Sequence, residues 1–168
     1  MHPVRRGLTR GLALVALATA FLGLNPNHAQ AQTTYRWNVA GTGAYNSATN
    51  WTPTRSAPAA TDILVIDGAF TPTPTLTTVI TQTIGQLSVR NGAAVILQGS
   101  SSPTLTLAGG AGTDLDIPAG TSVTISGATI LIVNVATGAT GVISGALTMA
   151  GAAHRLTAAD PGGIVFAS

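Results

Sequence analysis

The sequence predicts an all-β protein, a right-handed parallel β-helix that opens with an aromatic cap, and three observations support this. Short apolar clusters, such as Ile63–Ile66 and Val95–Leu97, are separated by Gly, Ser, Asn or Pro along the chain, which is typical of strands between turns. Several clusters alternate strictly between apolar and hydroxyl residues, as in Thr104–Leu107, which indicates one buried and one solvated face. A short sequence motif, consisting of a turn followed by a strand, also occurs more than once along the chain, and we call it the recurring phrase.

The recurring phrase favours stacked coils over other β folds. Asn91–Gly99 (NGAAVILQG) aligns with Ala119–Gly127 (AGTSVTISG), and Thr137–Gly145 (TGATGVISG) is a weaker copy. The intervals between the copies differ, so the repeat is degenerate, but like units stacked on like units are typical of a solenoid. We expect inward Val, Ile and Leu side chains to fill the core and glycines to form the tight corners between the faces.

The alternative fold is an antiparallel β-sandwich. Asn91 and Gly92 lie between two apolar clusters, which is the strongest short signal for a hairpin. The spacing of the strand starts also fits a sandwich. We favour the β-helix because the copies of the phrase follow one another in the same sense along the chain.

The first 31 residues predict a cleaved secretory leader with a helical apolar segment. Arg5, Arg6 and Arg10 precede the apolar run 11–24, and Ala29-Gln30-Ala31 has the small-x-small form of a cleavage site. The run is too short to span a bilayer, so we expect a secreted or cell-surface protein that begins at Gln32. The domains predicted are the leader 1–31, an aromatic cap segment 32–62 and solenoid repeats 63–168. Because the last residues fall within or just after a strand, we expect the solenoid to be truncated.

The charge of the mature chain excludes several classes of partner. Without the leader, four arginines face five aspartates, and the sequence has no Lys or Glu. There is no basic stripe for a nucleic acid and no polybasic patch for a membrane surface. We therefore expect no nucleic-acid partner and no membrane insertion of the mature chain. The absence of cysteine excludes disulfides and thiolate metal sites.

The aromatic residues give the first candidate site. All the Tyr and Trp residues of the chain lie close together in the sequence: Tyr35, Trp37, Tyr45 and Trp51. Such rings stack on sugars and permit a glycan site, but the first coil of a solenoid also needs a plug because it has no neighbour on one side. We favour the plug.

Acidic residues and one histidine give the remaining candidates. Asp114 and Asp116 are two apart on a strand and are weak calcium candidates, although the favoured interpretation places both on the solvent face beside inward Leu115 and Ile117. Asp62 and Asp67 bracket a strand and either pair with Arg55 or Arg90 or keep a strand edge soluble.

His154 could act as a base with Asp160 to orient it, but it has no nucleophile to activate. No serine lies in a G-x-S-x-G motif and the chain has no cysteine, so we expect an exposed turn histidine. The sequence predicts no catalytic residue, no cofactor and no metal, and therefore no enzyme.

The mature chain, over most of its length, resembles the N-terminal part of a family of large proteins. The segment Tyr35-Arg-Trp37-Asn, Ser47–Pro53 with Asn50-Trp51, Ala57-Pro58 and Asp62–Ile66 is similar to the pattern that opens many bacterial secreted or surface β-helix proteins. These are adhesin-like, autotransporter-passenger-like or type IX-secreted repeat proteins. The resemblance implies a non-enzymatic structural or adhesin-like segment that meets surface glycans or other cell-surface proteins. The alternative is a carbohydrate-binding or carbohydrate-active β-helix module.

Overall fold

The structure is a computed structural model, and it describes residues 32–109, 112–159 and 163–167. The leader predicted at 1–31 therefore lies outside the described residues, as does Asp160. Within the described ranges, no helix is both long enough and apolar enough to cross a membrane. The elements are β1 (Thr34–Trp37), β2 (Thr42–Ala44), the 3-10 helix η1 (Ala48–Asn50), β3 (Trp51–Thr52), β4 (Ile63–Asp67), β5 (Thr75–Val79), β6 (Gln82–Ile84), β7 (Gln86–Arg90), β8 (Ala94–Gly99), β9 (Thr104–Leu107), β10 (Thr113–Ile117), β11 (Ser122–Gly127), β12 (Ile132–Val135), β13 (Thr140–Ile143), β14 (Ala146–Gly151), β15 (Arg155–Ala158) and β16 (Gly163–Phe166).

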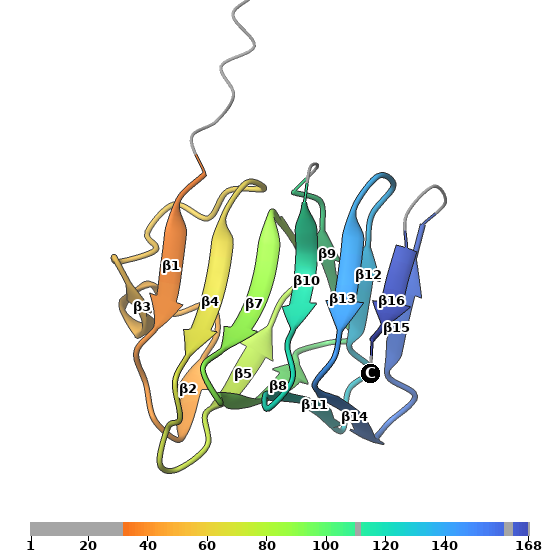
Figure 1. Cartoon of the computed structure of the whole chain (residues 1–168). Helices are drawn as coiled ribbons and strands as arrows, with labels where there is room; N and C mark the ends of the chain where they lie inside the picture. The colour runs from red at the N-terminus through yellow and green to blue at the C-terminus, as the bar shows by residue number, and fades with distance from the viewer. Residues whose placement is uncertain (1–31, 110–111, 160–162, 168) are drawn as a thin grey trace, which may run out of the picture.

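The strands form three sheets that run side by side along one axis (Figure 1). The seven-stranded sheet has the order β16-β13-β10-β7-β4-β1-β3, the five-stranded sheet β14-β11-β8-β5-β2 and the four-stranded sheet β15-β12-β9-β6. From β4 onward every third strand thus returns to the same sheet, and β4–β6, β7–β9, β10–β12 and β13–β15 are four complete coils. This confirms the predicted parallel β-helix.

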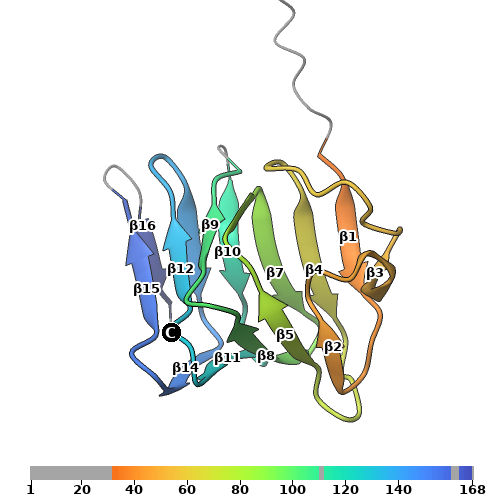
Figure 2. The same cartoon turned by 180° about the vertical axis from the view of Figure 1, so that it is seen from behind.

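The coils wind in a right-handed sense. In Figure 1 the chain descends along the seven-stranded sheet at the front, passes below, and ascends at the back, as Figure 2 shows from behind, while each coil lies to the right of the preceding one. Right-handed crossovers are the strong preference for parallel strands. Among the described strands, only β1 and β3 pair antiparallel, so the alternative β-sandwich is wrong.

The core lies inside the coils and is built from stripes of aligned apolar residues. Val95 pairs with Val123 and Leu97 with Ile125, which is the alignment that the recurring phrase predicted. All four side chains are buried. The weaker copy, Thr137–Gly145, lies in a different place, because its strand β13 belongs to the seven-stranded sheet whereas β8 and β11 belong to the five-stranded one.

The Asn91-Gly92 turn connects two sheets instead of closing a hairpin. Both residues have positive φ, 53° and 74°, the backbone conformation of a tight turn that glycine and asparagine adopt most readily. The turn leads from β7 in the seven-stranded sheet to β8 in the five-stranded sheet. The local signal was therefore correct for a turn, and the hairpin that it suggested is wrong.

Candidate functional site

Charged side chains that are exposed or partly exposed gather on the outer face of the seven-stranded sheet. They lie on β1, β4, β7 and β10, which are neighbours in that sheet. We call this group, with the polar residues that link it, the charged row: Arg36, Asp67, Ser88, Arg90, Asn91 and Asp116.

Strand alternation and register bring the charged row together. Arg36 points outward because its neighbours Tyr35 and Trp37 are buried, and Ser88 and Arg90 alternate with the buried Leu87 and Val89 in the same way. Across the strands, Asp67 is the register partner of Arg90 and Asp116 is that of Ser88. Adjacent strands lie about 4.8 Å apart, so the sequence-distant charges become neighbours.

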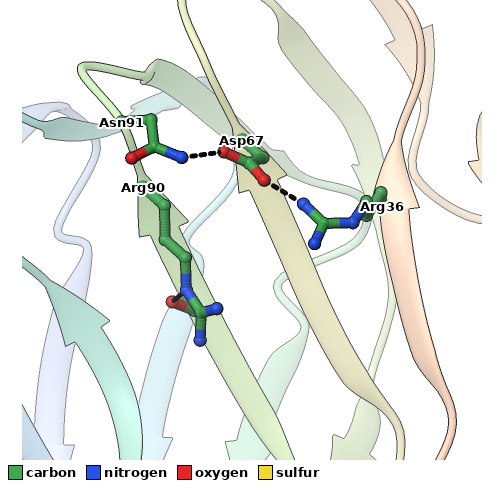
Figure 3. Close-up of polar contacts among 5 residues, drawn as sticks. Arg36, Asp67, Arg90 and Asn91 are labelled. Atoms are coloured by element: carbon green, nitrogen blue, oxygen red, sulfur yellow. Dashed lines mark hydrogen bonds and ion pairs between the residues drawn. The ribbon is translucent and has the colours of Figure 1, made fainter.

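Two chains of polar contacts hold the charged row in place, and Figure 3 shows the one that runs through Asp67. Asp67 lies between Asn91, whose Nδ2 donates to Asp67 Oδ1 over 2.6 Å, and Arg36, whose Nη1 pairs with Asp67 Oδ2. Arg90 Nε donates to Ser88 Oγ over 2.7 Å, and Ser88 Oγ donates to Asp116 Oδ2 over 3.1 Å. The side chains of the row are therefore ordered before any partner arrives.

The charges of the row are partly open to solvent. The Arg36 side chain is 53% exposed and that of Asp67 is 25% exposed. The hydrogen bond from Asn91, with further help from Arg36, holds the pKa of Asp67 below its usual value, against a smaller opposing effect of desolvation. The terminal nitrogens of Arg90 make no hydrogen bond with the described residues, so they are available to a carboxylate or hydroxyl of a partner.

The two calcium candidates do not act together, and the expectation that both face solvent is wrong for Asp114. The register of β10 against β13 shifts between Thr113 and Leu115, so Asp114 is an extra residue in the strand and turns away from Asp116. Its side chain is fully buried, and Thr140 N donates to its Oδ2 over 2.9 Å. Burial raises the pKa of Asp114. Within the described residues no group of three or more His, Cys, Asp or Glu side chains is placed to hold a metal ion.

The four aromatic residues pack together inside the first coil. Tyr35, Trp37, Tyr45 and Trp51 are all buried. Trp51 meets Trp37 and Tyr45 edge to face, with ring centroids 5.0 and 5.8 Å apart, and its Nε1 donates to Tyr45 O over 2.8 Å. In this arrangement the rings present no open face on which a sugar could stack.

A buried ion pair lies beside the aromatic cluster. Arg55 Nε donates to Asp62 Oδ2 over 2.7 Å, and both side chains are buried, so the predicted pairing formed and the interpretation of Asp62 as a solubilising edge charge is wrong. The Arg55 guanidinium also lies 5.8 Å from the ring centroids of Tyr35 and Tyr45. Burial raises the pKa of Tyr45 to about 12, although the positive charge of Arg55 opposes this shift.

His154 is buried, so the expectation of an exposed turn histidine is wrong. Its Nδ1 accepts a hydrogen bond from Leu131 N over 3.1 Å, and its Nε2 lies 3.2 Å from Ala150 O. Because Nδ1 is an acceptor, Nε2 is the protonated nitrogen and donates to Ala150 O. The ring therefore links the corner before β12 to the end of β14 in the next coil.

Sequence reasoning missed Arg36, Ser88 and Asn91 as members of one site. For Arg36 and Ser88 the signal was present, because they alternate with buried apolar residues of β1 and β7. Asn91 lies in the turn after β7, where alternation gives no direction. The alternation gives the outward direction but not the register between coils, which depends on corner loops of unequal length.

Comparison with known proteins adds no family to this description. The chain gives no significant match to a protein-family model, a curated protein or a solved structure.

Proposed function

We propose that the chain is an exported, non-enzymatic β-solenoid segment with an adhesin-like role, and that the charged row is the surface that binds its partner. The observation that carries the proposal is the gathering of Arg36, Asp67, Arg90 and Asp116 on one sheet face. The partner we propose is a cell-surface glycan that carries hydroxyl and carboxylate groups.

The chemistry of the row supports a polar glycan. The charges alternate in sign from strand to strand, from Arg36 on β1 and Asp67 on β4 to Arg90 on β7 and Asp116 on β10. Arginine binds a carboxylate through two parallel hydrogen bonds, and aspartate accepts hydrogen bonds from sugar hydroxyls. A row with both groups fits a partner that carries both donors and acceptors.

The rigidity of the row also supports binding. Asn91 fixes Asp67, and Ser88 links Arg90 to Asp116. Side chains that are held before binding lose less conformational entropy when the partner arrives. The alternative of a sugar platform made by the tryptophans has less support, because Trp37 and Trp51 are buried.

The test combines export with binding. The full chain is expressed in a bacterial host, recovered from the envelope or the culture fluid, and examined by mass spectrometry, which should give an N-terminus at Gln32. The exported protein is then applied to an array of acidic and neutral glycans. We expect retention on acidic glycans that weakens as salt is added, because the contacts are between exposed charges.

A matched set of arginine variants distinguishes glycan binding at the charged row from nonspecific attraction by any positive charge of the protein. Arg36→Gln and Arg90→Gln should each lower glycan retention, whereas Arg155→Gln, which removes an exposed arginine from the four-stranded sheet, should leave it unchanged. Equal losses in all three variants, or no retention by the unmodified protein, would contradict binding at the charged row. A retained Met1 on a cytoplasmic protein would contradict export.

A further inference from the structure

The charged row divides into two parts, and the first is a closed ion pair. Both oxygens of the Asp67 carboxylate are in use: Oδ1 accepts from Asn91 Nδ2, and Oδ2 pairs with Arg36 Nη1 (Figure 3). The charge of Arg36 is therefore compensated by direct contact with a carboxylate. We call Arg36 and Asp67 the closed pair. This part of the row attracts an incoming anion only weakly.

The second part of the row consists of Arg90 and Asp116, which are bridged by a hydroxyl and not paired directly. Ser88 Oγ accepts from Arg90 Nε over 2.7 Å and donates to Asp116 Oδ2 over 3.1 Å, so the guanidinium and the carboxylate are held two hydrogen bonds apart. Neither group makes a direct ion pair with any described residue. Within the described part of the chain, the terminal nitrogens of Arg90 and Asp116 Oδ1 also have no hydrogen-bond partner. We call Arg90 and Asp116 the open pair.

The Arg90 side chain lies along β7. Its Nε reaches back two residues to Ser88 Oγ, and Figure 3 shows the side chain following the strand. Ser88 is an outward residue between the core residues Leu87 and Val89, yet it is only 2% exposed, which fits an arginine stem that lies across it. Since Nε is already in use, the two terminal nitrogens form the free edge of the guanidinium. Such an edge binds a carboxylate through two parallel hydrogen bonds.

We propose that the open pair binds one acidic sugar residue of the partner glycan, an assignment that rests on the proposed function. Arg90 binds the carboxylate of a uronic acid residue, and Asp116 Oδ1 accepts a hydrogen bond from a neighbouring hydroxyl of the same sugar. In a uronic acid residue whose C4 hydroxyl is free, that hydroxyl and the carboxylate are attached to adjacent ring carbons. One sugar therefore offers an acceptor to Arg90 and a donor to Asp116 at a short separation.

The charges around Arg90 determine which anion fits. Asp67 is the register partner of Arg90 on β4, and Asp116 is the register partner of Ser88 on β10, so a carboxylate lies on the strand to each side of β7. These two negative charges oppose an anion that approaches Arg90. A dianion such as a phosphate ester is opposed more strongly than a single carboxylate, and it brings no hydroxyl donor of its own for Asp116. The open pair should therefore select carboxylated sugars over phosphorylated ones.

The first test uses sugars that differ only in the group at C6. Glucuronate, glucose and glucose 6-phosphate are each immobilised through C1, which leaves the C4 hydroxyl free, and the exported full chain is passed over them. We expect glucuronate to retain the protein at least about tenfold more strongly than glucose, because hydrogen bonds to a charged group are lost with the carboxylate, and more strongly than glucose 6-phosphate. Equal retention by glucuronate and glucose, or stronger retention by the phosphate, would overturn the assignment while glycan binding itself stands. No retention by any glycan of the array would instead contradict the proposed function.

Two double variants that leave the net charge unchanged locate the contact. Arg90→Gln with Asp116→Asn removes the open pair and should abolish the preference for glucuronate over glucose. Arg36→Gln with Asp67→Asn removes the closed pair and should keep that preference, although total retention falls. Loss of the preference in both variants, or in neither, would overturn the assignment.

A single variant keeps the test independent of how the double variants fold, which far-UV circular dichroism checks. Arg90→Lys keeps the positive charge but lacks the two parallel donors of the guanidinium. It should lower retention by glucuronate and leave retention by glucose unchanged. Unchanged retention by glucuronate would show that Arg90 does not bind the carboxylate.

Discussion

At the scale of single residues, Trp51 connects the parts of the first coil. Its ring packs edge to face against Trp37 and Tyr45, and its indole N–H is bonded to Tyr45 O. A buried ring with a satisfied donor contributes both transfer energy and specific geometry. The residue is therefore suited to hold strand β3 against β1.

Replacing Trp51 tests whether the aromatic cluster is structural. Trp51→Ala should lower the free energy of unfolding by about 3–5 kcal/mol, through lost burial and a new cavity. Trp51→Phe keeps an aromatic ring and should lose clearly less. The measurement is urea unfolding followed by circular dichroism. An unchanged midpoint in Trp51→Ala together with lost glycan retention would instead identify the tryptophans as a sugar platform.

Asp114 and Asp67 predict opposite dependences of stability on pH. The pKa of Asp114 is raised by burial, so its contribution to stability is present below the pKa of the unfolded chain and is lost as pH rises through the folded value. The pKa of Asp67 is lowered chiefly by the hydrogen bond from Asn91, so its contribution is present above the unfolded value and is lost as pH falls.

The matched variants should show this difference in sign. As pH rises through the acidic range, the free energy of unfolding of Asp114→Asn should increase relative to the unmodified protein, whereas that of Asp67→Asn should decrease. Urea unfolding at several pH values below neutrality measures both. Parallel curves for the two variants would show that the buried and exposed carboxylates do not differ in this way.

At the scale of elements, the corners between strands set how closely successive coils can stack. Gly145 lies at the corner between β13 and β14, where its N–H donates to Ile117 O over 2.7 Å. A Cβ at this position would lie 2.5 Å from both Pro118 O and Thr121 O. Both are backbone atoms of the preceding coil, so no side chain can move aside to make room.

Gly145→Ala should therefore destabilise the protein by forcing two coils apart. We expect a loss of about 1–3 kcal/mol, the usual cost of overpacking, measured by thermal or urea unfolding. Gly163→Ala is the control, because a Cβ there meets no described atom within 4 Å and φ is not positive. Similar unfolding midpoints for the two variants would contradict close packing at the Gly145 corner.

The sequence allowed the positions of the strands to be predicted better than which strands pair with one another. Alternation identified the inward Leu105 and Leu107, and the recurring phrase identified the register of Val95 with Val123. The recurring phrase did not identify the sheet of Thr137–Gly145, because the sequence of a turn followed by a strand is similar whichever sheet the strand belongs to. The direction of Asp114 could not be predicted, because Asp114 is the extra residue of a bulge and does not follow the alternation that holds for Leu115 and Ile117.

At the scale of the whole molecule, the site was harder to predict than the fold. The fold depends on repeated local patterns, and these are visible in one chain. The charged row depends on single residues from four coils, and Arg36 meets Asp67 only because β1 and β4 align in one particular register. The buried partners of Arg55 and His154 depend on corner geometry in the same way.

The two ends of the solenoid give the molecule a direction. One end is closed by aromatic side chains, and the other shows unfinished core stripes. In a stack where each coil contacts only its neighbours, stability depends on how many interfaces each coil makes. Among the described strands, the coil β13–β15 has a complete neighbouring coil on one side only, so it makes fewer contacts between coils than the coils before it.

The corner loops differ in length from coil to coil, yet the strands keep their register. Residues added or removed at a corner lie on the surface and leave the hydrogen-bond ladders unchanged, because loop length alters the free energy of folding only slowly. Insertions and deletions can therefore accumulate at the corners over evolutionary time without disturbing the core. For an engineer, the same corners are positions where a foreign peptide or an enzyme-recognition tag can be grafted at a chosen height along the stack.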